Sequence, residues 1–286
     1  MASALPNILA SSARSIDSLM TRLMGVPYTL LTRDWLIHER VQYLADWAGR
    51  LPNGGLRIMD AGCGAGLSFF YLQRRYASKV AYYAGIDLDT RRLRERYHRA
   101  TIPHDFIDAD LDSRWRLGKF DLIFVSEVIE HIIEDRRLFA RLCQHLTDGG
   151  VLVVTAPNKS FVRATARVLP GFDAVSATQE GGHVRIGYDP DELNAFAREN
   201  SLTTISKSYL GRISMRELRK RDALRDHADF ANTARFNLPW LLRRALRKEP
   251  DDAREHQYWS LAMAFRKSAQ VSIRETYLEG ERMQSA

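Results

Sequence analysis

Short apolar runs and amphipathic stretches alternate along the first half of the chain. The apolar runs have the length of buried strands and cover residues 56–62, 80–89, 104–111, 120–129 and 151–158. The stretches between them carry apolar residues at helical spacing, at residues 67–77, 90–100 and 134–146. This alternation predicts an α/β three-layer sandwich, in which a mostly parallel sheet lies between two layers of helices.

The pattern is less regular on either side of this region. Residues 33–50 carry apolar residues on one face at helical spacing and predict a helix before the sheet. Residues 159–188 read as a loop-rich connection. A helix is expected over 189–200, with Asp189 or Asp191 as its cap. Two further strands are expected after this helix, over residues 202–211 and 258–267.

These elements predict three parts of the chain. Residues 1–50 form an N-terminal helical segment, or cap. Residues 51–211 and 257–268 form the main domain. Residues 212–256 form a helical, basic insertion between the last two strands, because a connection of this length needs its own structure.

Composition and charge narrow the class of partner. The chain has 286 residues and a formal net charge of +7. This charge either favours anionic partners or reflects only an arginine-rich surface. Aromatic residues are sparse among the basic ones, so a nucleic-acid partner is disfavoured. Residues 236–248 predict an amphipathic basic helix, which either contacts anionic lipid or packs on the domain as a lid.

The cysteines and the longest apolar runs bear on the compartment. Cys63 and Cys143 belong to no CxxC pair, so neither a disulfide framework nor a zinc ribbon is implied. No run approaches the roughly 20 apolar residues of a membrane span. We expect a cytoplasmic protein, with contact at the inner face of a membrane as a further option.

A glycine-rich turn between the first strand and its helix is the first candidate site. Its sequence, Asp60-Ala-Gly62-Cys-Gly64-Ala-Gly66, lets the backbone approach a ligand closely and presents N–H groups at a helix start. The next strand ends in Asp87, at the spacing where an acid binds ribose hydroxyls. The acid inside the turn and the GxGxG spacing differ from dinucleotide-binding turns.

Over residues 56–157 these motifs resemble the class I S-adenosylmethionine (SAM)-dependent methyltransferases. The resemblance implies a Rossmann-like fold with a seven-stranded sheet whose last strand is antiparallel. It also implies that Asp60 and the glycines line the methionine part of SAM, that Asp87 binds the ribose and that Leu88 packs on the adenine. The remaining cofactor contacts that it implies come from Arg40, Asp110, Leu111 and Ser126.

A second motif, Ser-Glu127-Val-Ile-Glu130-His131-Ile, follows the fourth strand. With the later stretch GGHVRIGYDPDEL, residues 181–193, it resembles the ubiquinone-pathway O-methyltransferases, which methylate phenolic hydroxyls of prenylated rings. The insertion at about 212–256 departs from that family. The same ExxEH arrangement occurs in metal-dependent RNA 2′-O-methyltransferases.

This motif admits two chemistries. If the chain turns helical directly after the strand, Glu127, Glu130 and His131 share one helix face. His183 is then a fourth candidate, and such a set suits Mg²⁺, Mn²⁺ or Zn²⁺. Alternatively His131 is a general base that a glutamate orients, or Glu130 and His131 are only a buried structural pair.

Three functions from different classes therefore stay open. The first is SAM-dependent O-methylation of a hydroxyl on a small-molecule or lipid-linked acceptor. The second is methylation of RNA or another nucleic acid. The third is a non-catalytic protein that binds SAM and a partner, against which the intact acids Asp60, Asp87 and Asp110 argue.

Overall fold

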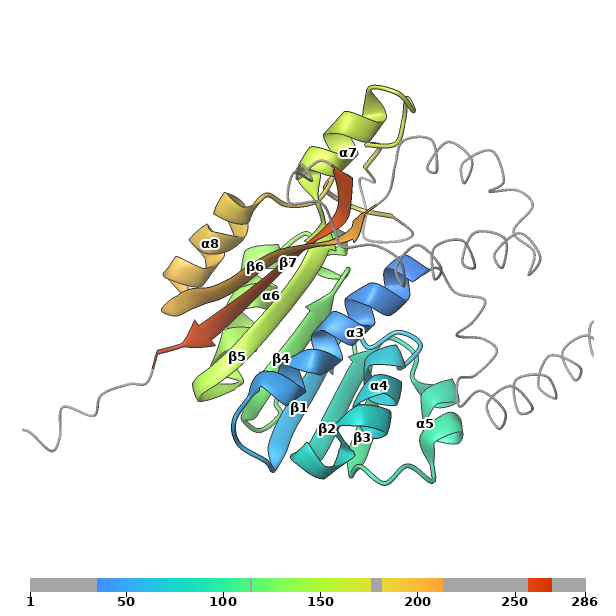
Figure 1. The fold of residues 1–286 in the computed structure, drawn as a ribbon, viewed down its shortest axis with the longest axis vertical. Helices are drawn as coiled ribbons and strands as arrows, with labels where there is room; N and C mark the ends of the chain where they lie inside the picture. The colour runs from blue at the N-terminus through green and yellow to red at the C-terminus, as the bar shows by residue number, and fades with distance from the viewer. Residues whose placement is uncertain (1–34, 114, 176–181, 213–256, 269–286) are drawn as a thin grey trace, which may run out of the picture.

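A seven-stranded sheet forms the centre of the computed structural model, which describes residues 35–113, 115–175, 182–212 and 257–268 (Figure 1). The strand order is β3-β2-β1-β4-β5-β7-β6. The strands from β3 to β5 run parallel, and β7 runs antiparallel to both of its neighbours, which confirms the predicted sheet. The strands are β1 (Leu56–Ala61), β2 (Val80–Asp87), β3 (His104–Asp108), β4 (Phe120–Ser126), β5 (Leu146–Pro157), β6 (Leu202–Arg212) and β7 (Tyr258–Lys267).

Helices cover both faces of the sheet because each presents an apolar stripe to it. On one face Leu44 of α3 (Trp35–Arg50), Leu72 of α4 (Leu67–Arg75) and Leu93 of α5 (Arg91–Tyr97) are buried in one cluster. On the other face Phe139 of α6 (Asp135–Gln144) and Phe196 of α8 (Pro190–Glu199) are buried in a second cluster. Short 3₁₀ turns η1 (Ala77–Lys79) and η2 (Ile129–His131) follow α4 and β4. The predicted three-layer architecture is therefore confirmed (Figure 1).

The region expected to be a loop-rich connection contains a further helix, α7 (Lys159–Ala166). The side chain of Asn158 caps it by accepting a hydrogen bond from the Ser160 N–H, at 3.1 Å. Phe161 of α7 packs in a separate aromatic cluster with Phe172 and Trp259. An Asn cap ahead of a short amphipathic stretch was the available sequence signal.

The end of β4 also differs from the sequence prediction. The predicted strand continued to residue 129, but β4 ends at Ser126. Glu127 then takes a left-handed backbone conformation, with φ of 51°, which a strand cannot accommodate. The chain therefore turns sharply at the carboxyl end of β4, and this turn carries the second sequence motif.

Two predicted features lie outside the described residues. They are most of the N-terminal segment and nearly all of the basic insertion, which includes the amphipathic helix expected at 236–248. Within the part of the chain that the structure describes, no helix combines the length and the apolarity that crossing a membrane requires.

Candidate functional site

The glycine-rich turn joins β1 to α4 at the carboxyl end of the sheet. The backbone N–H groups of Gly62 and Cys63 both donate to the Ile86 carbonyl, at 2.8 and 3.0 Å, and fix the turn against β2. Gly62 has a φ of 81°, and a Cβ there would lie 2.2 Å from a methyl carbon of Val128. Only glycine fits this position, since the turn packs directly against the segment that follows β4.

Asp60 lies beneath this turn and is almost completely buried. Its Oδ2 accepts a hydrogen bond from the Tyr83 hydroxyl at 2.8 Å. Burial raises the pKa of Asp60 to about 6, although the hydrogen bonds from Tyr83 and Ser68 oppose the shift. The protonation of Asp60 is therefore sensitive to a ligand bound at the turn, because a positive charge there would favour the ionised carboxylate.

Asp87 lies across from the turn at the end of β2. Its two carboxylate oxygens accept hydrogen bonds from the backbone N–H groups of Gly64, at 2.7 Å, and Leu88, at 2.8 Å. The Leu88 side chain is 73% exposed, which is unusual for a large apolar residue. A carboxylate, a glycine backbone and an exposed apolar side chain thus lie together and could hold a ligand with a sugar and an aromatic ring.

The other predicted cofactor residues lie along the same edge. The backbone N–H of Ala109 donates to the Asp87 carbonyl at 2.9 Å, which brings the segment that carries Asp110 next to Asp87. The Asp110 side chain is exposed, whereas Leu111 is buried. Ser126, at the end of β4, shares a hydrogen bond with Thr155 at 2.9 Å.

Glu130, His131 and His183 form a carboxylate–imidazole cluster beside this edge. Glu130 Oε1 lies 4.0 Å from His131 Nε2 and 3.9 Å from His183 Nε2. The three potential ligand atoms all lie within 4.8 Å of one another. Glu130 is fully buried, and neither of its carboxylate oxygens accepts a hydrogen bond.

Burial also governs the protonation of this cluster. Desolvation raises the pKa of Glu130 well above its usual range, and the nearby Glu127 carboxylate adds to that shift. Desolvation likewise lowers the pKa of His183, and the neighbouring His131 lowers it further. An unpartnered buried carboxylate costs folding free energy, so its retention here points to a functional role.

One predicted ligand, Glu127, does not join the cluster. The chain does not turn helical directly after β4, because η2 begins only at Ile129 and Glu127 precedes it with a positive φ, so the condition for a shared helix face is not met. A carboxylate oxygen of Glu127 instead lies 3.4 Å from an Arg40 guanidinium nitrogen in a largely buried ion pair. Arg40 of α3, expected near the cofactor, thus pairs with the residue that follows β4.

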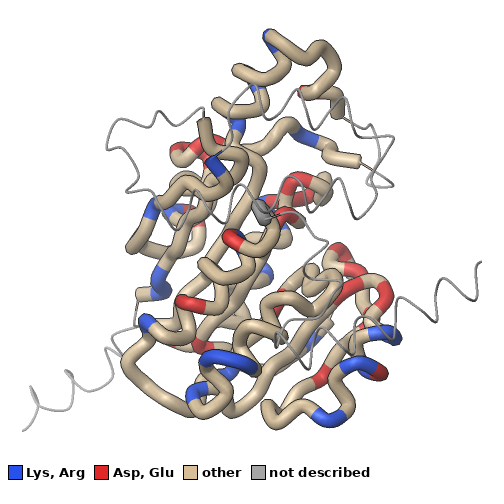
Figure 2. Tube along the Cα trace, turned by 45° about the vertical axis from the view of Figure 1, so that its right-hand side comes forward, with Lys and Arg blue, Asp and Glu red and all other residues tan. Residues whose placement is uncertain are grey.

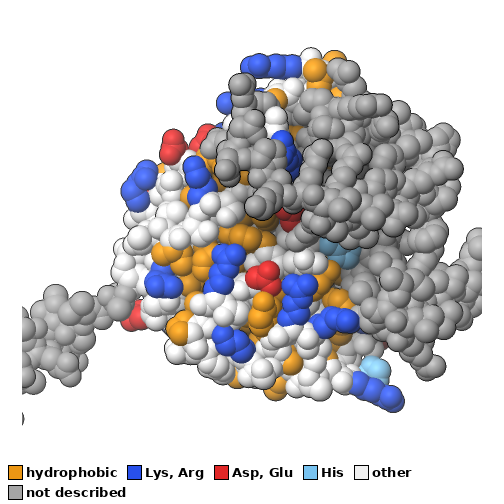
Figure 3. Space-filling view, viewed as in Figure 1, with side chains coloured by type: hydrophobic (Ala, Val, Ile, Leu, Met, Phe, Trp, Pro, Cys, Tyr) orange, Lys and Arg blue, Asp and Glu red, His pale blue; other side chains and the backbone are white. Residues whose placement is uncertain are grey.

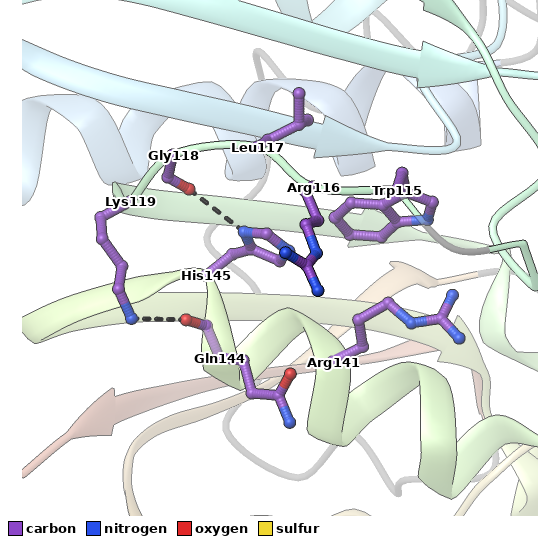
Figure 4. A pocket seen from close by; sticks show the side chains of 8 residues that line it. All are labelled: Trp115, Arg116, Leu117, Gly118, Lys119, Arg141, Gln144 and His145. Carbon is purple, nitrogen blue, oxygen red and sulfur yellow. Dashed lines mark hydrogen bonds between the residues drawn. The ribbon is translucent and has the colours of Figure 1, made fainter.

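A surface pocket of about 530 Å³ lies at the opposite end of β4 and is not part of this site. Figure 4 shows Lys119 donating to the Gln144 carbonyl and His145 bonded to the Gly118 carbonyl. The His145 ring stacks on Trp115 with centroids 4.8 Å apart. The ammonium group of Lys119 in this pocket donates to a carbonyl at the end of α6, so its charge stabilises the helix terminus.

Basic and acidic positions are interspersed along the described part of the trace in Figure 2. On the face in Figure 3, Lys and Arg side chains lie among acidic, apolar and neutral groups. Most of the basic insertion lies outside the described residues, and the expectation against a nucleic-acid partner stays a prediction from the sequence.

Comparisons with known proteins agree with these observations. Residues 59–154 match the methyltransferase domain family. The chain is 27% identical over 177 residues to a ubiquinone biosynthesis O-methyltransferase from Aromatoleum aromaticum, covering 59% of this chain and 73% of that protein. It is 32% identical over 144 residues to a trans-aconitate 2-methyltransferase from Rhizobium rhizogenes, covering 48% of this chain but only 55% of that protein.

A solved structure shares the fold. The N-methyltransferase NodS from Bradyrhizobium japonicum, in complex with S-adenosyl-L-homocysteine, superposes with a TM-score of 0.52 at 18% identity and covers 84% of this chain and 91% of that chain. The resemblance expected from the sequence is thus confirmed. Residues 59–154 therefore carry a methyltransferase domain, on a fold that SAM-dependent methyltransferases share.

Proposed function

We propose that the protein transfers the methyl group of SAM to a hydroxyl oxygen of a small-molecule or lipid-linked acceptor. We propose further that the carboxylate–imidazole cluster holds a divalent cation that activates this hydroxyl. The observation that carries the proposal is the arrangement of Glu130, His131 and His183, whose ligand atoms face one another. The segment that carries Glu130 and His131 packs on the glycine-rich turn through Val128. The similarity to ubiquinone biosynthesis O-methyltransferases supports a hydroxyl acceptor.

The hydrogen bond that His131 makes through Nδ1 favours a cation in the cluster. Nδ1 lies 2.9 Å from the Gly182 carbonyl, which can only accept, so Nδ1 is the donor. In the neutral imidazole Nε2 then presents a lone pair toward the buried Glu130 carboxyl group. Two acceptors that face each other need a proton or a metal ion between them. A ligating histidine ordinarily donates its other N–H to a carbonyl in this way.

The ligand set also narrows the class of ion. Because Glu127 pairs with Arg40, the cluster offers two imidazole nitrogens and one carboxylate. Imidazole-rich sets suit Zn²⁺ and related transition ions, while Mg²⁺ prefers oxygen ligands throughout. We therefore expect Zn²⁺ or Mn²⁺ to bind more tightly than Mg²⁺.

The proposed chemistry needs a positioned and deprotonated acceptor. Methyl transfer from a sulfonium is an in-line displacement, in which the acceptor oxygen forms a bond to the methyl carbon as the bond to sulfur breaks. Holding the two reactants in line supplies much of the rate. A bound divalent ion lowers the pKa of a coordinated hydroxyl, so that the proton leaves at neutral pH.

The first test of this proposal uses His131→Ala. We expect the ion-free wild-type protein to bind one Zn²⁺ or Mn²⁺ by calorimetry and the variant to bind neither, with SAM affinity unchanged. Transfer of a deuterated methyl group from SAM to a cell-extract fraction, followed by mass spectrometry, should fall by about 10²–10⁴-fold in the variant. A chelator should reproduce the loss in wild type, and added ion should reverse it.

Other outcomes separate the alternatives. Loss of transfer in His131→Ala, without ion binding or chelator sensitivity in wild type, would identify His131 as a general base. Near-normal transfer in the variant would leave His131 a structural residue. Transfer to RNA but not to small-molecule fractions would contradict the proposed acceptor.

A second prediction concerns the pH dependence of SAM binding. The pKa of Asp60 is about 6 because the carboxyl group is buried. The sulfonium and ammonium of bound SAM stabilise the ionised carboxylate, so binding lowers that pKa and releases a proton below about pH 6. SAM affinity should therefore rise with pH up to about 6 and then level off, by at most about tenfold per unit.

Calorimetry across that range measures this effect. Asp60→Asn cannot ionise, and its SAM affinity should lose the rise below about pH 6. An unchanged profile in Asp60→Asn would assign the pH dependence to another group.

A further inference from the structure

A partly exposed arginine joins the two segments that carry the carboxylate–imidazole cluster. One guanidinium nitrogen of Arg185, Nη2, donates to the carbonyls of Ile132 and Ile133, each at 3.0 Å. The other, Nη1, lies 2.8 Å from Asp135 Oδ2 in an ion pair. Arg185 therefore connects the segment of His183 to the segment of Glu130 and His131 through three separate groups.

Asp135 and Tyr188 complete this connection. The Tyr188 hydroxyl lies 2.7 Å from Asp135 Oδ2 and 3.2 Å from the Ile129 carbonyl. Both side chains are buried, and the Arg185 guanidinium lies 5.8 Å from the centre of the Tyr188 ring. Ion pairs and charge-assisted hydrogen bonds are strongest in such sheltered surroundings.

The position of His183 depends on the same contact between segments. The two residues that flank His183 are both bonded to the other segment. The Val184 N–H donates to the Glu130 carbonyl at 2.9 Å, and the Gly182 carbonyl accepts from His131 at 2.9 Å. Since Glu130 and His183 are far apart in sequence, the distance between them is set entirely by how these segments dock.

We propose that Arg185, together with Asp135, is a positioning residue that holds His183 within ligand distance of Glu130. This inference rests on the proposed metal function of the cluster. Arginine suits the role because its planar fork bonds several acceptors at once, whereas lysine offers a single point charge. Without Arg185 the ion would have to order the His183 segment on binding, and that cost would weaken its affinity.

The test measures ion affinity and SAM affinity in the same full-length variants. Titration of Zn²⁺ or Mn²⁺ alone into Arg185→Met should show about 10–100-fold weaker binding, as for other groups that orient a metal ligand. The ion affinity of Arg185→Lys should lie between those of Arg185→Met and wild type. The control is Arg136→Lys, whose arginine forms an exposed ion pair with Glu199 on the adjoining helix and should bind the ion as wild type does.

A double variant separates positioning from general destabilisation. If Arg185 acts through His183, then Arg185→Met should weaken ion binding no further in a His183→Ala background. SAM affinity should stay within about twofold of wild type throughout, since Arg185 lies in a different segment from the glycine-rich turn. Saturating ion should also restore the transfer activity of Arg185→Met.

Several results would overturn the inference. If wild type binds the ion and Arg185→Met binds it equally well, the positioning role is wrong while the metal site stands. Additive losses in the double variant, or a parallel loss of SAM affinity, would show a general structural role. A wild type that binds neither Zn²⁺ nor Mn²⁺ would overturn the metal site and the positioning role together. Tyr188→Phe keeps the buried ring and provides the same comparison if Arg185→Met does not fold.

Discussion

Replacement of Glu130 by glutamine is expected to abolish ion binding and lower kcat by about 10²–10⁴-fold. The glutamine keeps the size of the side chain but cannot supply an anionic ligand. SAM affinity should be unchanged, because Glu130 is not among the cofactor residues proposed above. Product formation and SAM calorimetry on the same sample measure the two effects separately.

The same variant should be more stable than wild type when no ion is present. Burial raises the pKa of Glu130 in the folded protein. The carboxyl group therefore contributes most to stability at low pH, below its unfolded pKa, and this contribution is lost as the pH rises through the raised folded pKa. Glutamine does not titrate, so at pH 8 the variant avoids that loss. Each kcal/mol gained should raise the Tm by about 2–4 °C.

Added ion should then reverse the order of stability. A ligand that binds only the folded state raises the Tm of wild type and leaves that of the variant unchanged. Glu134→Gln is a matched control, since Glu134 is an exposed carboxylate four residues further on. A Glu130→Gln protein with normal turnover and an unchanged response to Zn²⁺ or Mn²⁺ would contradict the proposed role of Glu130.

The centre of the sheet could be predicted from the sequence because strands such as β1, β4 and β7 are buried on both faces. Such strands are continuous apolar runs, and β7 occupies the predicted residues 258–267. The sequence also predicts the start of α8. Asp189 caps it and Glu192 closes the reciprocal capping box, which is a purely local arrangement of side chains.

The site was less accessible to sequence reasoning because it depends on contacts between distant segments. The left-handed conformation of Glu127 has no local glycine signal, and it removes Glu127 from the face that the spacing predicted. It is stable because the Glu127 N–H donates to the Thr155 carbonyl and its side chain pairs with Arg40. Non-glycine residues adopt this conformation only where their surroundings impose it.

The Arg185 connection is a similar case. The sequence shows a histidine followed by an arginine two residues later, which singles out the loop but not what the arginine contacts. Asp135 looks like an ordinary first-turn acid of α6, a position that the helix dipole alone favours. Only the docked loop reveals that this carboxylate also binds Arg185 and Tyr188.

Replacement of Asp87 by alanine is expected to weaken SAM binding by about 10²–10⁴-fold. Each charge-assisted hydrogen bond from the carboxylate to a ribose hydroxyl contributes about 1.5–3 kcal/mol. The two oxygens already accept the N–H groups of Gly64 and Leu88, and each retains a further lone pair for the ribose. Asp87 thus binds two backbone N–H groups and the proposed ligand through the same two atoms.

Asp87→Asn distinguishes these two roles. Asparagine keeps one carbonyl oxygen, but its NH₂ group then faces a backbone N–H, so one of the two bonds from the N–H groups of Gly64 and Leu88 is lost. We expect an affinity between those of wild type and Asp87→Ala by calorimetry. Asp89→Ala is the matched control, because the Asp89 carboxylate is exposed and pairs with Arg91. Equal SAM affinity in wild type and Asp87→Ala would contradict the assignment of Asp87, whereas an equal loss in Asp89→Ala would show that the effect is only the removal of negative charge from this edge.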